Sequence, residues 1–377
     1  MSGSASPLFA PLALGALRLH NRIAMAPMTR YFSPGGVPGP DVAEYYARRA
    51  RSGVGLVITE GVYVPHPSAH AYQNVPHFYG DAALAGWKAV AAAVHEAGGR
   101  IFPQLWHTGP VRELGMAPDP SLPGFAPSEE DGAATRAMTE SDIAEVIAAY
   151  ARAAADAQRL KFDGVEIHGA HGYLIDSFLW DRTNRRTDRW GGGLVDRARL
   201  GIEVVRAIRG AVGPDFPICF RWSQFKQQDY RARLAQTPAE LGPLLAALAD
   251  AGVDIFHAST RRFWEPAFPD HGELTLAGWT KQLSGRPVIA VGSVGLEGVA
   301  RITGSADVPG GGVSFAASTV SGIDQLRDLE TRLAAGEFDM IAVGRSLLAD
   351  PEWAEKVHQG RLDERIAFDK ANLARLI

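Results

Sequence analysis

Short apolar stretches rich in β-branched residues recur along the chain, and each is followed by a longer segment with helical periodicity. The eight stretches are residues 23–26, 55–59, 100–105, 164–168, 218–221, 254–257, 287–291 and 340–343. They are mainly apolar rather than alternating, which is typical of parallel strands that are covered on both faces. Eight strand and helix units in succession predict a single (β/α)8 TIM barrel with long βα loops.

Two of the intervening segments show the helical pattern most clearly. Residues 143–150 and 241–248 have apolar side chains at positions i, i+3, i+4 and i+7. We expect Ser141 or Asp142 to cap the first helix and Thr237, which precedes a proline, to cap the second.

An open, doubly wound sheet is the alternative fold for the same alternation, but no Gly-x-Gly-x-x-Gly motif opens a helix. We expect one domain over residues 1–377, with two unusually long connections at 106–136 and 304–321. Both follow strands, so a barrel would place them at its C-terminal face, where they are candidate lids or insertion loops.

Composition narrows the class of protein. The chain has 377 residues, 46% of them hydrophobic, which is enough to bury a large core. Its net charge of -4 and its scattered basic residues argue against a nucleic-acid partner. No apolar stretch approaches the roughly 18 residues of a membrane span, the N-terminus lacks a basic signal region, and the single Cys219 reads as a buried apolar residue. We therefore expect a cytoplasmic enzyme.

Polar and ionisable residues concentrate where the predicted strands end. The relevant positions are residues 26–29, 104–107, 166–173, Arg221 and residues 344–345. Barrel active sites are assembled in this way, from one or two side chains at the end of each of several strands. The set as a whole predicts a site at the C-terminal face.

Five segments carry a family resemblance: residues 21–29, 104–107, 162–174, 183–192 and 343–345. The most specific is the run His-Gly-Ala-His-Gly-Tyr at 168–173 with Thr-Asn-Arg-Arg-Thr-Asp at 183–188. From about residue 8 to about residue 357 the chain resembles the Old Yellow Enzyme family of FMN-dependent ene reductases. The resemblance implies an NAD(P)H:FMN oxidoreductase that takes NADPH or NADH as hydride donor.

The resemblance also implies which residues bind FMN: Ala26, Pro27, Met28, Thr29, Gly61, Gln104, Arg221, Gly292, Ser293, Gly344 and Arg345. Thr29 would hydrogen-bond the C4 carbonyl edge of the flavin and Gln104 its pyrimidine ring, while Gly61 would contact the ring through its backbone. Arg221 would lie near the N1/C2 carbonyl edge, where a cation favours the anionic reduced form. A glycine and Arg345 at the start of a helix would hold the phosphate.

The family pattern further implies the catalytic groups. His168 and His171 would donate hydrogen bonds to the oxygen of an activating carbonyl or nitro group, and Tyr173 would donate the proton, because an ordinary tyrosine pKa near ~10 keeps it protonated. The implied substrate is a small electron-poor alkene, reduced in a ping-pong reaction with the nicotinamide cosubstrate. Candidate substrate-binding residues are Tyr31, Trp106, Trp264 and the two histidines.

One segment departs from the family pattern. Residues 259–266, after the sixth predicted strand, are more aromatic and more basic than expected. The segment is compatible with gating the site, with binding the phosphate of the nicotinamide, or with anchoring a packed loop. Thr29 in place of a cysteine argues against the branch that tunes its flavin with a thiol.

Rival functions remain open at this point. Glu166, His168 and His171 can be drawn as a metal triad of a barrel hydrolase, although no later strand offers further ligands and Arg221 and Arg345 would repel a metal. An FMN-dependent dehydrogenase of amines or hydroxy acids, or a flavin-binding protein without turnover, would keep the same barrel. The sequence leaves open the physiological alkene, the preference between NADH and NADPH, and whether the protein is a monomer or a homodimer.

Overall fold

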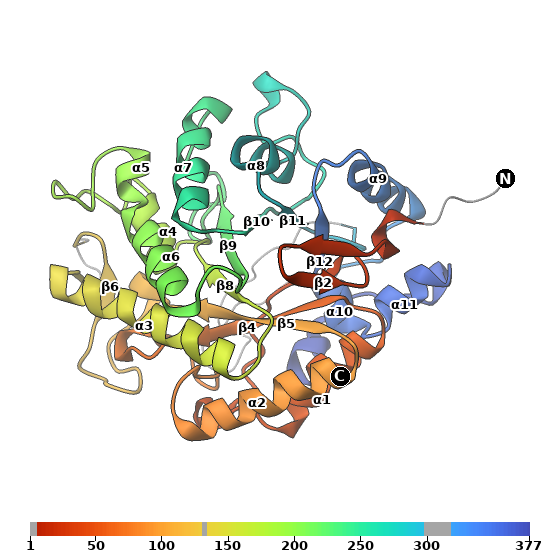
Figure 1. The fold of residues 1–377 in the computed structure, drawn as a ribbon, viewed down its shortest axis with the longest axis horizontal. Coiled ribbons are helices and arrows are strands. Elements are labelled where there is room, and N and C mark those ends of the chain that lie inside the picture. The colour runs from red at the N-terminus through yellow and green to blue at the C-terminus, as the bar shows by residue number, and fades with distance from the viewer. Residues whose placement is uncertain (1–5, 130–133, 298–317) are drawn as a thin grey trace.

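The computed structural model describes residues 6–129, 134–297 and 318–377, and its centre is a closed barrel of eight parallel strands (Figure 1). In chain order the barrel strands are β3 (Ile23–Met25), β4 (Leu56–Tyr63), β5 (Arg100–Trp106), β8 (Val165–His168), β9 (Ile218–Ser223), β10 (Ile255–Ser259), β11 (Val288–Val291) and β12 (Met340–Val343). The barrel closes where β12 pairs with β3, with Ile341 opposite Ile23. The prediction of a (β/α)8 barrel is therefore confirmed.

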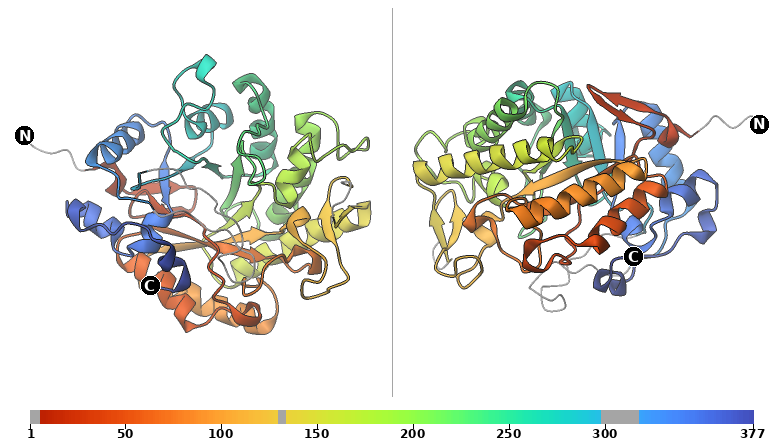
Figure 2. Two further views of the ribbon diagram at one scale, coloured as in Figure 1. Left: turned by 180° about the vertical axis from the view of Figure 1, so that it is seen from behind. Right: turned by 60° about the horizontal axis from the view of Figure 1, so that its bottom comes forward.

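Helices surround the barrel on its outside, as the two further views in Figure 2 make clear. The longer ones are α1 (Pro40–Arg51), α2 (Asp81–Glu96), α3 (Glu140–Arg159), α6 (Arg199–Val212), α7 (Pro238–Ala251), α8 (Leu276–Ser284) and α9 (Ile323–Ala334). Short helices are α4 (Leu174–Leu179), α5 (Leu194–Arg197), α10 (Arg345–Ala349) and α11 (Trp353–His358). Their apolar stripes cover the outer faces of strands that are buried along their whole length, such as β4 and β9.

A small β-hairpin packs against the apolar residues of the barrel interior. Its strands, β1 (Leu12–Leu14) and β2 (Leu17–Leu19), pair in antiparallel fashion, and their buried leucines cluster with interior residues of the barrel strands such as Ile58 and Phe102. The sequence analysis did not predict this hairpin. Cys219 lies in the same cluster and is buried and free, in line with its interpretation as a small apolar residue.

One of the two predicted helix caps needs correction. The cap of α3 is Thr139, not Ser141 or Asp142: the Thr139 hydroxyl accepts from the Asp142 backbone N–H, and the Asp142 carboxylate accepts in return from the Thr139 N–H. Asp142 is thus the second half of a capping box, one turn inside the helix. The cap of α7 at Thr237 is as predicted.

The long connection at 106–136 contains regular structure. Strand β6 (Gly124–Ala126) lies within it and pairs with strand β7 (Thr135–Ala137), which begins at its end. Residues 304–317 of the other candidate lid lie outside the described residues. The role of either segment as a lid stays a prediction.

The C-terminal segment folds back across the barrel and ends near α1 (Figure 1). The Arg30 guanidinium, which is buried, donates to the carbonyl of Asn372 at 3.1 Å and to that of Arg375 at 2.9 Å. These bonds attach the last residues of the chain to the loop that follows β3. In the described part of the chain, none of the helices has the length and apolar character needed to cross a membrane.

Candidate functional site

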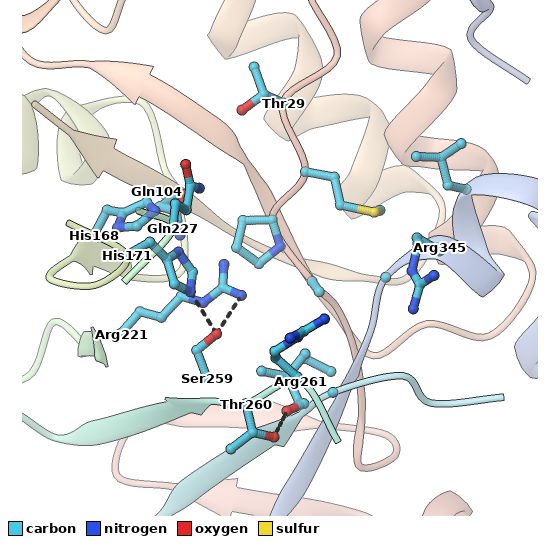
Figure 3. A pocket seen from close by; sticks show the side chains of 18 of the residues that line it. Thr29, Gln104, His168, His171, Arg221, Gln227, Ser259, Thr260, Arg261 and Arg345 are labelled. Carbon is cyan, nitrogen blue, oxygen red and sulfur yellow. Dashed lines mark hydrogen bonds between the residues drawn. The ribbon is translucent and has the colours of Figure 1, made fainter. Parts of the chain in front are cut away.

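A cavity opens at the C-terminal ends of the barrel strands, and it gathers most of the predicted site residues (Figure 3). The predicted residues that line it are Ala26, Pro27, Met28, Thr29, Tyr31, Gln104, Trp106, His168, His171, Tyr173, Arg221, Gly292, Ser293, Gly344 and Arg345. They come from six of the eight barrel strands or from the residues that directly follow them. The prediction of a site at this face of the barrel is supported by their convergence.

Two predicted residues are not brought to the cavity lining. A Cβ on Gly61 would lie 2.5 Å from Cε3 of the Trp106 ring, so the absence of a side chain lets Trp106 pack against β4. Gly61 therefore makes room for the Trp106 ring, which lines the cavity, and its backbone contact with the flavin stays a prediction. Trp264 packs edge-on against Phe263, with ring centroids 5.1 Å apart.

Sequence reasoning missed further lining residues: Arg30, Tyr72, Phe225, Gln227, Tyr230, Val291, Val294, Leu296, Ala342, Leu348 and Leu373. Ser259 ends β10, and Thr260 and Arg261 follow it; all three line the cavity and belong to segment 259–266, for which gating the site was one of the possibilities that the sequence left open. Gln227 lies on the loop that follows β9, the strand that carries Arg221. Leu373 carries no local signal, since it reaches the cavity only because the C-terminal segment folds back.

The two histidines stand together on one wall of the cavity. His168 ends β8, His171 has a left-handed backbone with φ of 67°, and their ring centroids are 5.1 Å apart. The Nδ1 atom of His168 accepts a 3.4 Å hydrogen bond from the backbone N–H of Ala170, which leaves an Nε2–H as donor. Nε2 of His171 lies 2.9 Å from the Ser259 hydroxyl.

Both histidines are held neutral. Burial, with the positive charge of Arg221, lowers the pKa of His168 from its ordinary value to about 3. The same causes hold the pKa of His171 well below its ordinary value. Over the whole neutral range the pair therefore offers uncharged N–H donors, whose protonation does not change with pH.

Tyr173 lies beside the histidines. Its ring contacts those of Trp106 and His168 edge-on, at centroid distances of 4.8 and 5.0 Å. Its hydroxyl donates to Oε1 of Gln227 at 3.4 Å. Burial, together with the neighbouring Tyr72, raises the pKa of Tyr173 well above its ordinary value, so the phenol remains protonated at neutral pH.

A buried carboxylate fixes the amide of Gln104. Glu166 accepts from Nε2 of Gln104 at 2.8 Å and from Nδ1 of His257 at 2.7 Å, and the Cys219 thiol is 3.4 Å from the same carboxylate. Burial by itself would raise the pKa of Glu166, but His257, Arg221 and Gln104 stabilise the charged form and lower it below the ordinary value. With its NH2 group engaged by Glu166, Gln104 keeps its carbonyl oxygen as an acceptor for a ligand in the cavity.

The metal triad considered from the sequence does not form. Glu166 is engaged with Gln104 and His257 instead of converging with His168 and His171. No group of three or more His, Cys, Asp or Glu side chains is placed to hold a metal ion in the ranges that the structure describes.

Two arginines lie at opposite sides of the cavity in Figure 3. Arg221 donates to the Ser259 hydroxyl at 3.3 Å, while its Nε is buried without a hydrogen-bond partner. Arg345 donates to the hydroxyls of Ser318 at 2.6 Å and Ser293 at 3.1 Å. Burial, and the charge of Arg261, lower the pKa of Arg345 to about 10, which still leaves it a cation at neutral pH.

These residues fit the FMN that the resemblance implies. Arg345 has no carboxylate within ion-pair distance among the described residues, so an anion such as a phosphate would balance its charge. The unpartnered Nε of Arg221 and the free carbonyl of Gln104 offer a donor and an acceptor to a polar ring edge. Ala26 and Met28 supply apolar surface for a flat ring.

The contact between Glu166 and Gln104 leads to a first prediction. In Glu166→Gln the neutral amide no longer fixes the orientation of Gln104, and the charge of Arg221 loses its nearest balance. We expect the affinity of the apoprotein for FMN to fall about tenfold, or about 1.4 kcal/mol, in a titration followed by quenching of flavin fluorescence. The surface variant Glu140→Gln serves as control. An unchanged affinity in a folded Glu166→Gln protein would contradict this role.

Comparison with known proteins identifies flavin oxidoreductases as relatives, in agreement with the fit of the cavity residues to FMN. Residues 7–308 match the model of a family described as the NADH:flavin oxidoreductase / NADH oxidase family. The chain is 34% identical over 367 residues to an NADH oxidase of Thermoanaerobacter brockii, a match over 95% of this chain and 51% of that protein. It is 41% identical over 225 residues to 12-oxophytodienoate reductase 7 of Oryza sativa subsp. japonica, covering 56% of this chain and 57% of the relative.

Solved structures are similar along almost the whole chain. Morphinone reductase has a TM-score of 0.78 at 31% identity, with 99% of this chain and 94% of that chain covered. The Old Yellow Enzyme from Pichia sp. has a TM-score of 0.79 at 25% identity, covering 98% and 90%. The chain spans about half the length of the two curated relatives, at 51% and 57%.

Proposed function

Since the chain belongs to the NADH:flavin oxidoreductase / NADH oxidase family, which includes Old Yellow Enzyme, we propose that it is an FMN-dependent ene reductase. In this proposal NADPH or NADH drives the reduction of the C=C bond of α,β-unsaturated carbonyl or nitro compounds by a ping-pong mechanism. The observation that carries the proposal is the combination of two neutral histidines and a protonated tyrosine on one wall of the cavity.

FMN, when bound, supplies the hydride chemistry, accepting a hydride from the nicotinamide and delivering one to the alkene. Arg345 would hold the phosphate, and Gly292, Ser293 and Gly344 line the same cavity. Gln104 accepts from the ring edge through its carbonyl, and Arg221 donates to it. The remaining ring contacts belong to the residues after β3: Ala26, Pro27, Met28 and Thr29.

The histidines bind and polarise the alkene substrate. Nε2–H of His168, together with His171, donates to the carbonyl or nitro oxygen, where negative charge develops as hydride reaches the β-carbon. Neutral donors suit this task, because they stabilise the charge without transferring a proton to the oxygen. Tyr31 and Trp106 line the same cavity as the histidines, and their aromatic rings would pack against the alkene.

Tyr173 completes the reduction by giving its hydroxyl proton to the α-carbon. One hydride and one proton have then been added across the C=C bond, and the phenolate left on Tyr173 recovers a proton from water. The raised pKa of Tyr173 keeps its hydroxyl protonated and able to donate, and Gln227 accepts a hydrogen bond from that hydroxyl.

The direct test is an anaerobic absorbance titration of the purified protein. We expect about one FMN per chain, bleaching on addition of NADPH or NADH, and return of the yellow colour with 2-cyclohexenone, a maleimide or a nitroalkene. A colourless, flavin-free native protein that turns over a substrate would refute the proposal. Bleaching by amines or hydroxy acids, with no reoxidation by any alkene, would favour the dehydrogenase alternative.

Binding of a phenol probes the histidine pair separately from turnover. We expect 4-chlorophenol to bind as its phenolate and to give a broad long-wavelength band with oxidised FMN, because two donors stabilise the anion. Since the histidines do not titrate near neutrality, affinity should rise about tenfold per pH unit up to the pKa of the phenol and then level off.

Single variants and a chelator separate this reading from a metal site. His168→Ala and His171→Ala should each weaken phenol binding by about tenfold or more and fade the band. A chelator should change neither affinity nor absorbance. Loss of the band on chelation, or an unchanged affinity for the phenol in both variants, would contradict the role of the histidine pair.

A further inference from the structure

A second cavity, lined by arginines, lies beside the site. Its lining residues include Arg231, Arg233, Arg261 and Arg262, and among the described residues Glu265 is the one acidic side chain that lines it. The four arginines come from two loops, one after β9 and one after β10. A concentration of positive charge of this kind is unusual in a chain whose net charge is -4.

The two cavities share a wall. Phe225, Tyr230, Ser259, Thr260 and Arg261 line both of them. The Arg261 guanidinium lies 4.3 Å from the centre of the Tyr230 ring. Because the same residues line both spaces, the two cavities are direct neighbours, and a ligand longer than the first cavity would meet the second one next to it.

The charges in the second cavity are only partly balanced. Arg262 pairs with Glu265 at 2.5 Å, and this pair uses the one acid of the lining. Arg233 donates to the neutral carbonyl of Ala267 at 2.8 Å. Across the described residues, neither Arg231 nor Arg233 has a carboxylate within ion-pair distance, since the nearby Asp229 lies 3.8 Å from Arg182 instead. The cavity is therefore suited to an anion that it does not itself contain.

We propose that this arginine cavity is a subsite for the 2′-phosphate of NADPH, and that it makes the enzyme prefer NADPH to NADH. The inference rests on the proposed function and extends it to the choice of donor. NADPH and NADH differ only in that phosphate, and the planar guanidinium groups match its oxygens. The carboxylate of an anionic alkene has the same charge, but in a small substrate it would stay in the first cavity beside the histidines.

The first experiment measures binding without redox chemistry. Isothermal titration of the FMN-loaded protein compares 2′,5′-ADP with 5′-AMP, which lacks the 2′-phosphate. We expect 2′,5′-ADP to bind at least tenfold more tightly, and the double variant Arg231→Ala/Arg233→Ala to reduce that ratio to about twofold or less. Arg206→Ala, an exposed arginine on α6 away from both cavities, is the matched control and should leave the ratio unchanged. Equal binding of the two nucleotides to the native protein would overturn the proposal.

A kinetic arm distinguishes the two sources of the anion. The double variant should raise the KM for NADPH about tenfold or more and that for NADH less than twofold, with kcat retained. It should treat a carboxylate-bearing enone and its methyl ester alike. Loss confined to the anionic enone would overturn the assignment to the donor. Failure of both donors to bleach the flavin would instead refute the proposed function, while the nucleotide comparison still decides the subsite.

Discussion

Replacing Tyr173 with phenylalanine is expected to slow the reoxidation of reduced enzyme by 2-cyclohexenone about 10²-fold or more, leaving reduction by the nicotinamide unchanged. The hydroxyl is the proton source on the wall that also carries His168 and His171, and its removal leaves only water to protonate the α-carbon. Stopped-flow absorbance measures the two half-reactions separately. Because burial raises the pKa of Tyr173 well above its ordinary value, the native rate should show no loss from this group up to about pH 9.

Two comparisons make this experiment specific. The rate of reoxidation by maleimides should fall less in Tyr173→Phe than the rate of reoxidation by cyclohexenone. The carbanion formed from a maleimide is more stable and can be protonated by water. Tyr150→Phe, a buried tyrosine of α3 outside the cavity, is the control for general effects of removing a hydroxyl. Slower reduction by the nicotinamide with intact enone turnover would show that Tyr173 has a different role.

The barrel could be read from the sequence because each of its strands is marked locally. A strand buried on both faces is mainly apolar rather than alternating, so residues 218–220 and 340–343 can be recognised as strands from their own sequence. The (β/α)8 arrangement then places all strand ends at one face, and this is why Gln104, Arg221 and Arg345 could be expected in one site.

Features that depend on contacts between distant segments were beyond that reasoning. The pairing of Glu166 with His257 joins side chains of β8 and β10, two strands that are separated by β9 in the barrel. Leu373 reaches the cavity because Arg30 holds the C-terminal carbonyls. Gly61 was expected at the ring, but its position is set by the bulk of Trp106 on the neighbouring strand. None of these contacts leaves a periodic signal in the sequence.

Replacing Arg345 with alanine is expected to weaken FMN binding about 10²-fold, equivalent to about 3 kcal/mol, so that the purified variant loses much of its yellow colour. Arg345 is 9% exposed and its guanidinium is held by two serine hydroxyls, so its charge is directed toward the anion that occupies that side of the cavity. Its pKa of about 10 means that the charge is present throughout the neutral range. The ratio of flavin to protein absorbance and the dissociation constant of the reconstituted apoprotein measure the effect.

The conservative variant and two ligands decide whether the lost contact is the one to phosphate. Arg345→Lys keeps the charge but not the paired donors, and should bind FMN with an affinity between the native and alanine proteins. Riboflavin, which lacks the phosphate, should bind the native and Arg345→Ala proteins with nearly equal affinity, whereas FMN should distinguish them. If riboflavin lost affinity as strongly as FMN, Arg345 would be supporting the ring side of the cavity. Full retention of FMN by a folded Arg345→Ala protein would place the phosphate elsewhere in the barrel.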